Sequence, residues 1–303
     1  EGSKIKSFNT DLFYNCIMLK KVKITDNSSL HRICKGAFYN TNIESLFIPA
    51  TVDDIEDNWC EKVCYLNEIE ISPKNKNFKF LDEEHKIIVG KSDKNSEIFD
   101  TIIFACRDIK EATIPKEIKY IKPRVFEDCD ELKTVNFSDD SEIRTFKSKT
   151  FSSKSIENIL NIPSTVEELD EDWCGNPNNL TNVIISPKNK NFKYLDKEHK
   201  IIVGKSNKKS EIFDTIIFAS RNIKQATIPK QIKFIQKNAF KNCKLLKNLE
   251  IPDDSEIISI GGRAFANTSI VSFRSPKQIY KYEGSFLYSC KDLLCLEFLG
   301  NSF

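Results

Sequence analysis

The chain has 303 residues, with 46 Lys and Arg against 44 Asp and Glu, so its formal net charge is only +2. The two signs are interspersed along the sequence, which argues against the long basic stripe of a nucleic-acid-binding protein. Apolar runs are far shorter than the ~18 residues of a membrane-spanning helix, so we expect no membrane span in this segment.

Short apolar runs recur along the chain at a regular spacing, which predicts a repeat protein. Successive runs start 23 or 24 residues apart, except for two steps of 43 residues, and their first residues are Leu19, Ile43, Leu66, Ile109, Leu132, Ile156, Leu180, Ile223, Leu246, Ile270 and Leu293. Residues 59–143 and 173–257 also repeat each other at a constant offset of 114 residues. A period near 23 is typical of leucine-rich-repeat solenoids, whose stacked units share one core. We therefore predict a single domain over 1–303, with both ends truncated.

Each unit combines an aromatic anchor, a small or polar residue and a short strand. In the run from Leu132 to Phe137, apolar Val135 and Phe137 alternate with polar residues, as in a half-buried strand. Proline then ends several strands, as at Pro49. We predict a β-rich leucine-rich-repeat solenoid: a right-handed superhelix with one parallel strand per unit and a short helical or irregular convex side. Its predicted core includes Phe13, Leu19, Val22, Ile24, Phe38, Trp59, Phe126, Leu132, Val135, Trp173, Phe240, Leu246, Leu249 and Ile251.

The two 43-residue steps contain inserts near 78–98 and 192–212. In the first insert a polar turn at 82–85 separates two apolar segments, which predicts a hairpin that bulges from the edge of the array. Of the 49 residues in 71–119, 41 are unchanged in 185–233. This near-identity has two interpretations, twin binding loops or recent segmental duplication. We favour duplication, because it copies surface and core alike.

Residues 239–252 read AFKNCKLLKNLEIP and closely resemble the BspA-like leucine-rich repeat, in which Ala-Phe is followed by Cys, Leu, Ile and Ile-Pro at the same positions. Residues 228–235, IPKQIKFI, match the second half of that unit. The inserts are also similar to those of the family, because NFKYLD at 191–196 matches its Asn-x-x-Phe and Leu-Asp pattern. This resemblance covers essentially the whole chain and implies the same solenoid fold.

The resemblance also carries functional expectations. Members of this family are surface or secreted molecules of bacteria and of some unicellular parasitic eukaryotes, with roles in adhesion to host proteins and cells or in aggregation with other microbes. A high content of Lys, Asn, Ile and Phe fits the eukaryotic, parasite-type branch. The sequence departs from the bacterial pattern in its few glycines, since only 260–265, IGGRAF, approaches the usual Ile-Gly before the anchor. The family carries no shared catalytic residues.

Candidate catalytic and metal-binding residues are few. Of the three histidines, His85 and His199 occupy the same position in the two hairpin turns, and we interpret both as solvated turn residues. For the third, His31, as for the other two, the spacing indicates no nearby residues that would support acid–base chemistry or metal binding. Phosphate-binding and nucleophile motifs are absent. We therefore expect no enzyme activity, no cofactor and no metal.

Ten cysteines raise the question of disulfides. Cys16, Cys129, Cys243 and Cys290 recur at one position of the unit, but sister units hold other residues there, which a disulfide framework would not tolerate. We favour free thiols that act as small apolar residues. The alternative is one or more bridges, with Cys60 and Cys64 as the nearest pair.

The polar positions of the strands should point away from the core and form a continuous surface, which we name the ribbon face. Reading along the array, the ribbon face consists of Lys21, Lys23, Ser45, Phe47, Glu68, Glu70, Glu111, Thr113, Thr134, Asn136, Asn182, Ile184, Gln225, Thr227, Asn248, Glu250, Ser272 and Arg274. Phe47 and Ile184 are its apolar positions, and an aromatic residue on such a face is a candidate interface anchor.

Two functions fit these observations. The first is a non-catalytic adhesion module of a cell-surface or secreted protein, which binds a protein or glycoprotein of a host or neighbouring cell through the ribbon face. The second is an intracellular, cytoplasmic scaffold of the same fold, which free cysteines would favour because thiols persist in reducing compartments. Nucleic acid is not an expected partner in either case.

Overall fold

The computed structural model describes residues 4–175 and 178–298, with the side chain of Leu160 excepted. Within these ranges the chain is a parallel β-solenoid of about 13 turns with 25 strands and no helix. The predicted fold class is therefore confirmed. Turns take the place of the short helices that were one alternative for the side opposite the strands.

One set of strands forms the ribbon sheet, which carries the ribbon face. Each strand begins two residues after the first residue of a predicted apolar run, and the strands are β3 (Ser45–Ile48), β5 (Glu68–Ile71), β9 (Glu111–Ile114), β11 (Thr134–Phe137), β13 (Asn158–Ile162), β15 (Asn182–Ile185), β19 (Gln225–Thr227), β21 (Asn248–Glu250), β23 (Ser272–Arg274) and β25 (Cys295–Glu297). The first run forms no strand, and Lys21 makes only an isolated parallel bridge to Ser45.

A second sheet runs along the other side of the core. Its strands have two residues each, and they are β1 (Ser7–Phe8), β2 (Arg32–Ile33), β4 (Asp54–Ile55), β10 (Tyr120–Ile121), β12 (Thr145–Phe146), β14 (Glu168–Leu169), β20 (Phe234–Ile235), β22 (Ser259–Ile260) and β24 (Lys281–Tyr282). In each strand the second residue points inward, as Ile55 does beside Asp54. The second apolar strip of the unit is therefore a ladder of very short strands.

Each insert is a three-stranded antiparallel unit. β6 (Phe78–Phe80) and β7 (Ile87–Gly90) form the predicted hairpin, and β7 also pairs with β8 (Thr101–Ala105), which rejoins the second sheet by pairing in parallel with β10. The second copy has the same arrangement, with strands β16 (Phe192–Tyr194), β17 (Ile201–Gly204) and β18 (Thr215–Ala219).

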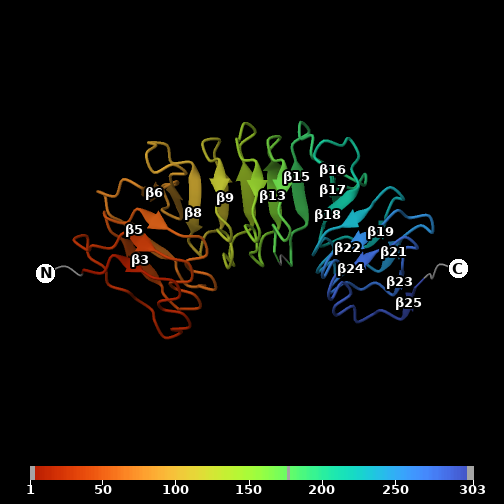
Figure 1. The fold of residues 1–303 in the computed structure, drawn as a ribbon, viewed down its shortest axis with the longest axis horizontal. Helices are drawn as coiled ribbons and strands as arrows, with labels where there is room; N and C mark the ends of the chain where they lie inside the picture. The colour runs from red at the N-terminus through yellow and green to blue at the C-terminus, as the bar shows by residue number, and fades with distance from the viewer. Residues whose placement is uncertain (1–3, 176–177, 299–303) are drawn as a thin grey trace.

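The inserts interrupt the pairing of the ribbon strands, although, as expected, they do not break the solenoid. Among the described strands, β5 is not paired with β9, and β15 is not paired with β19. We divide the ribbon strands at the inserts into an N-terminal block (β3, β5), a central block (β9 to β15) and a C-terminal block (β19 to β25), within which β21 is not paired with β23. Figure 1 shows these blocks as successive parts of an arch, with the inserts at the two joints and the chain ends far apart.

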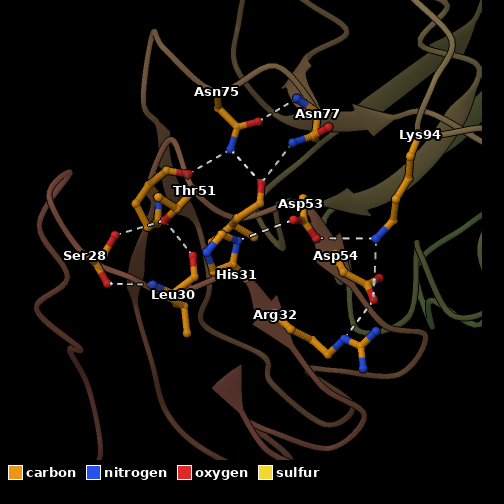
Figure 2. A network of polar contacts seen from close by, with 12 residues as sticks. Ser28, Leu30, His31, Arg32, Thr51, Asp53, Asp54, Asn75, Asn77 and Lys94 are labelled. Atoms are coloured by element: carbon orange, nitrogen blue, oxygen red, sulfur yellow. Dashed lines mark hydrogen bonds and ion pairs between the residues drawn. The ribbon is translucent and has the colours of Figure 1, made fainter. Parts of the chain in front are cut away.

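Each insert is anchored to the turn before it by an asparagine. Asn75 Nδ2 donates to the carbonyl oxygens of Pro49 and Val52, at 2.8 and 3.0 Å, and Lys94 Nζ lies 3.4 Å from Asp53 Oδ1 (Figure 2). In the second copy, the equivalent contacts join Asn189 to Pro163 and Val166, and Lys208 to Glu168. The joint is therefore a duplicated structure as well as a duplicated sequence.

A buried arginine closes each joint. The Arg107 guanidinium donates to the carbonyl oxygens of Val63, Ala105 and Val125, at 3.0 to 3.3 Å, and it lies over the ring of Phe104. Its equivalent in the second copy, Arg221, donates to Ala219 and Ala239 and lies over Phe218. Neither arginine has a carboxylate partner among the described residues, so backbone carbonyls, thiols and a ring hold the cation.

Most of the predicted core is buried. The buried members are Phe38, Trp59, Phe126, Leu132, Val135, Trp173, Phe240 and Leu246. The predicted residues that are only partly buried are Phe13, Leu19, Val22, Ile24, Leu249 and Ile251. The first four belong to the first repeat, which has a described neighbour on one side only. The last two lie on or beside β21, which is not paired with β23.

The scarcity of glycine does not prevent tight turns. Asn40, Asp128 and Asn242 adopt the left-handed conformation after the aromatic anchor, with φ of 52°, 58° and 63°. Short polar side chains tolerate this region better than other non-glycine residues. Asn267 is also left-handed, and its Nδ2 donates to Asn242 Oδ1 at 2.8 Å, so the turn residues of neighbouring units bond to each other.

Candidate binding surface

The predicted ribbon residues do point outward. Fifteen of the eighteen are exposed, while Ser45, Phe47 and Thr134 are half-buried. The burial pattern of β9, exposed-buried-exposed-buried, shows why: successive side chains in a strand face opposite sides of the sheet. Phe47 differs from the prediction, because its side chain is half-buried and not fully exposed. Ile184, at 43% exposed, is the more accessible apolar position.

The N-terminal block carries separated charges around an apolar centre. Lys21 pairs with Ser45, which pairs with Glu68, and Phe47 pairs with Glu70 in the next position along the strands. Neighbouring strands lie about 4.8 Å apart, so lysine and glutamate positions are about 10 Å apart with Ser45 and Phe47 between them.

These side chains, together with Lys23, line one open groove. The groove is lined by five charged residues, because Asp26 also belongs to it, and none of the five forms an ion pair with another described residue. The groove therefore presents two cations and three anions around Phe47, none of them neutralised by an ion pair. Such an arrangement is complementary to a ligand with both signs of charge flanking an apolar group.

The central block is rich in amides and hydroxyls. Thr113, Asn136 and Asn182 are exposed, and Asn158 Nδ2 donates to Thr134 Oγ1 at 3.4 Å. The sequence-based ribbon face omitted β13 and hence Asn158. The apolar run that starts at Ile156 could have identified this strand. However, the alternation of inward and outward side chains breaks within β13, where the pairing register shifts between residues 159 and 162.

The charged residues of the C-terminal block have polar partners. Thr227 Oγ1 donates to Glu250 Oε2 at 2.9 Å, which leaves that carboxylate charged, and Arg274 pairs with Asp253 and Glu297. Gln225, Asn248 and Ser272 are exposed and uncharged. The three blocks thus present different chemistry.

The histidines are surface residues. His85 stacks on Phe80, and His199 stacks on Tyr194, with ring centroids 4.4 and 4.1 Å apart, and both histidines are exposed turn residues. His31 Nδ1 lies 3.4 Å from Asp53 Oδ2 (Figure 2). Within residues 4–175 and 178–298, no group of three His, Cys, Asp or Glu is arranged to hold a metal ion.

All ten cysteines are free thiols. Burial raises the pKa of Cys60 and Cys106 to about 12 and that of Cys129 and Cys174 to about 11. A thiol with so high a pKa is protonated and unreactive at neutral pH. These cysteines therefore pack as small apolar residues.

A solenoid with one ribbon strand per 23-residue unit defines the class of leucine-rich-repeat proteins. The family model described as "BspA type Leucine rich repeat region" matches residues 2–81, 92–198 and 207–301, in six copies. The chain belongs to this family. A search of curated proteins finds no match.

Solved structures share the fold at low sequence identity. The pneumococcal vaccine antigen PcpA is 13% identical, with a TM-score of 0.50 over 94% of this chain and 78% of that one. A leucine-rich cell surface protein from Faecalibacterium prausnitzii is 18% identical, with a TM-score of 0.50 and coverages of 97% and 76%. A leucine-rich repeat protein from Eubacterium ventriosum is 20% identical, with a TM-score of 0.53, and the match covers 87% of this chain and 63% of that one. These similarities establish the fold alone.

Proposed function

We propose that this chain is a non-catalytic binding module of a cell-surface or secreted protein, and that its ribbon face binds a protein or glycoprotein of a host or neighbouring cell. The groove around Phe47 is the observation that carries the proposal, because five charged residues without ion pairs line it around a half-buried aromatic residue on the sheet. Fixed charges and an aromatic anchor are typical of binding surfaces. Each repeat also adds one more row of side chains to the same face.

Family membership and structural neighbours support the location. One structural neighbour is a leucine-rich cell surface protein, and another is a vaccine antigen. The elements that the structure describes include no apolar helix of membrane-spanning length. The Lys-, Asn-, Ile- and Phe-rich composition supports a source in the eukaryotic, parasite-type branch of the family.

Substitution of Phe47 tests the proposal. Labelled protein is titrated onto intact host cells and onto neighbouring microbes, and bound label is measured by flow cytometry. Phe47→Ala should weaken binding by at least about 1 kcal/mol, since it removes the anchor. Because Phe47 is half-buried, Phe47→Leu serves as the matched control that retains the packed part of the side chain.

The contrary result would move the site to the inserts. If Phe47→Ala binds fully, and binding disappears when the turns at 82–85 and 196–199 are replaced, the ribbon face is not the recognition surface. The near-identity of the two inserts would then reflect function rather than recent duplication.

The second candidate is an intracellular scaffold, which the ten free cysteines favour. Thiol labelling of protein from its native source distinguishes the two locations. Extensive pairing of the exposed cysteines, with other molecules or after rearrangement, would contradict the scaffold. Recovery of the protein only in cytosolic fractions, with no epitope accessible on intact cells, would contradict the adhesion module.

A further inference from the structure

The two copies of the 114-residue repeat differ chiefly in charge. Residues 71–135 contain 13 basic and 13 acidic residues, whereas the equivalent residues 185–249 contain 16 basic and only four acidic residues. The near-neutral total for the chain conceals this basic segment. The even mixture of signs expected from the whole sequence therefore does not hold in the second copy.

In the first copy, two lysines beside the ribbon sheet are paired with acids. Lys86 Nζ lies 2.6 Å from Asp108 Oδ2 at the base of the hairpin turn. Lys133 Nζ lies 2.9 Å from Glu157 Oε1 in the next turn of the solenoid. These contacts neutralise the lysines where the chain enters the ribbon strands.

In the second copy the lysines remain but the acids do not. Lys200 is the equivalent of Lys86, and Asn222 replaces its acidic partner. Lys247 is the equivalent of Lys133, and Val271 replaces the glutamate. Lys200 and Lys247 have no ion pair with any residue in the described ranges. Two positions that are neutral pairs in the first copy are therefore net cations in the second.

A third unpaired lysine lies between them. Lys224 is exposed, and its carbonyl oxygen accepts a hydrogen bond from the Lys247 amide at 3.0 Å, so the two lysines occupy neighbouring turns. In the first copy, Lys86 and Lys110, the equivalents of Lys200 and Lys224, line one hollow between the hairpin turn and β9. We name Lys200, Lys224 and Lys247 the lysine row.

The surroundings of the lysine row became less acidic as well. Glu83, in the first hairpin turn, corresponds to Lys197, and Glu111, in β9, corresponds to Gln225. The acids that remain nearby include Asp196, which accepts hydrogen bonds from the Lys200 and Ile201 amides, and Glu198, which is exposed in the turn. Glu250, in β21, accepts a hydrogen bond from Thr227 Oγ1. Each of the substitutions raises the local potential while leaving the fold unchanged.

We propose that the lysine row and the neighbouring ribbon residues bind an anionic polysaccharide, one that carries sulfate or carboxylate groups. Neighbouring turns place cations about 4.8 Å apart at the backbone, a spacing suited to closely spaced anions. Exposed Gln225, Thr227 and Asn248 supply amide and hydroxyl groups next to the lysines, which suit sugar hydroxyls.

Single-stranded nucleic acid is a poorer fit, because its binding sites use aromatic side chains for base stacking. The predicted ribbon residues of the C-terminal block are non-aromatic. This site lies in a different block from the Phe47 groove. The inference therefore goes beyond the proposed function and does not depend on it.

The first copy supplies the test. In the full chain, Lys197→Glu, Asn222→Asp and Gln225→Glu together restore the first-copy residues, which that copy already accommodates in the same fold. The probe is heparin, immobilised for salt elution and titrated in solution. We expect the triple variant to bind about tenfold more weakly than wild type and to elute at lower salt, because exposed charges act through a screened potential.

The reciprocal variant makes the opposite exchange in the first copy. Glu83→Lys, Asp108→Asn and Glu111→Gln convert the first copy to the second-copy residues and should strengthen heparin binding. Thermal melts should show that both triple variants are folded. Phe47→Ala should leave heparin binding unchanged, which separates this site from the proposed protein-binding groove.

Three results would overturn the proposal. Wild type that does not bind heparin, or equal binding by wild type and the acid-restored variant, would remove the lysine row as a site. Equal or tighter binding of single-stranded DNA or polyglutamate at matched charge would show that the site recognises another class of anion. Neutral dextran should not bind, and binding of dextran would exclude an electrostatic mechanism.

Discussion

Replacement of the buried Arg107 by methionine should destabilise the joint between the N-terminal and central blocks. The arginine is 5% exposed, and it connects three backbone carbonyls that come from different turns, those of Val63, Ala105 and Val125. Methionine fills a similar length of the cavity but donates no hydrogen bond. The substitution therefore tests the hydrogen bonds and the cation more than the packing.

The expected loss follows from those contacts. Each carbonyl left without a partner costs about 1 kcal/mol at the lower end of the range for buried groups. Loss of the contact with the Phe104 ring, whose centroid is 4.5 Å from the guanidinium carbon, adds about 1 kcal/mol. Part of this loss of stability is offset, because burying the arginine cation away from water was itself unfavourable. A net loss of about 3 kcal/mol is expected.

Guanidinium denaturation monitored by circular dichroism measures this loss. Repeat proteins depend on the interfaces between neighbouring units, so the variant should unfold earlier and in two separated transitions. Arg144→Met is the control, because Arg144 is exposed and its ion pair with Glu167 should contribute less than about 1 kcal/mol. A loss below about 1 kcal/mol for Arg107→Met, with one transition as in wild type, would refute the assigned role of the joint.

Four further predictions concern the fold and its buried thiols. Circular dichroism should show strand and turn signal, and a spectrum dominated by helix would contradict the solenoid. Leu246→Ala should cost roughly 2–5 kcal/mol in chemical denaturation because the side chain is fully buried; a loss near zero would mean that the inward register is wrong. Iodoacetamide at pH 8 should modify exposed Cys16 and Cys295 but not Cys60 or Cys106 until the chain unfolds. Burial raises the pKa of Cys60 and Cys106 above the usual 9, so the stabilising effect of these two thiols is complete below pH 9. The free energy of unfolding should therefore fall from pH 9 toward pH 12, as the thiols ionise in the unfolded chain. A difference from the Cys60→Ala, Cys106→Ala double variant that does not change over this pH range would contradict the prediction.

The solenoid was predictable because its signals are local. Leu132, Val135 and Phe137 are all buried, and the intervening Thr134 and Asn136 face outward, as the two-residue alternation requires. The same alternation identified almost the whole ribbon face. It omitted β13, where a register shift breaks the pattern between residues 159 and 162, and β25 at the C-terminal end of the described strands.

The partly buried residues were not predictable in the same way. Phe47 follows the outward pattern, yet it is half-buried, since its exposure depends on the side chains of adjacent turns. Phe13 and Leu19 have the sequence pattern of core residues, yet they are partly exposed because, among the described residues, the first repeat packs on one neighbour only. In both cases the exposure of the side chain depends on which turns lie next to it in the array, and the sequence of a single unit does not contain that information.

The amino-acid sequence by itself determined the period, the strand positions and the side of the sheet that each strand residue faces, because these follow from alternation within a few residues. Only the tertiary structure decided that the inserts divide the ribbon sheet into blocks and that Arg107 connects the turns at a joint. It also decided which charges remain unpaired, as Lys200 does where Lys86 is neutralised. These properties depend on partners in other turns of the solenoid, which become neighbours only when the turns stack.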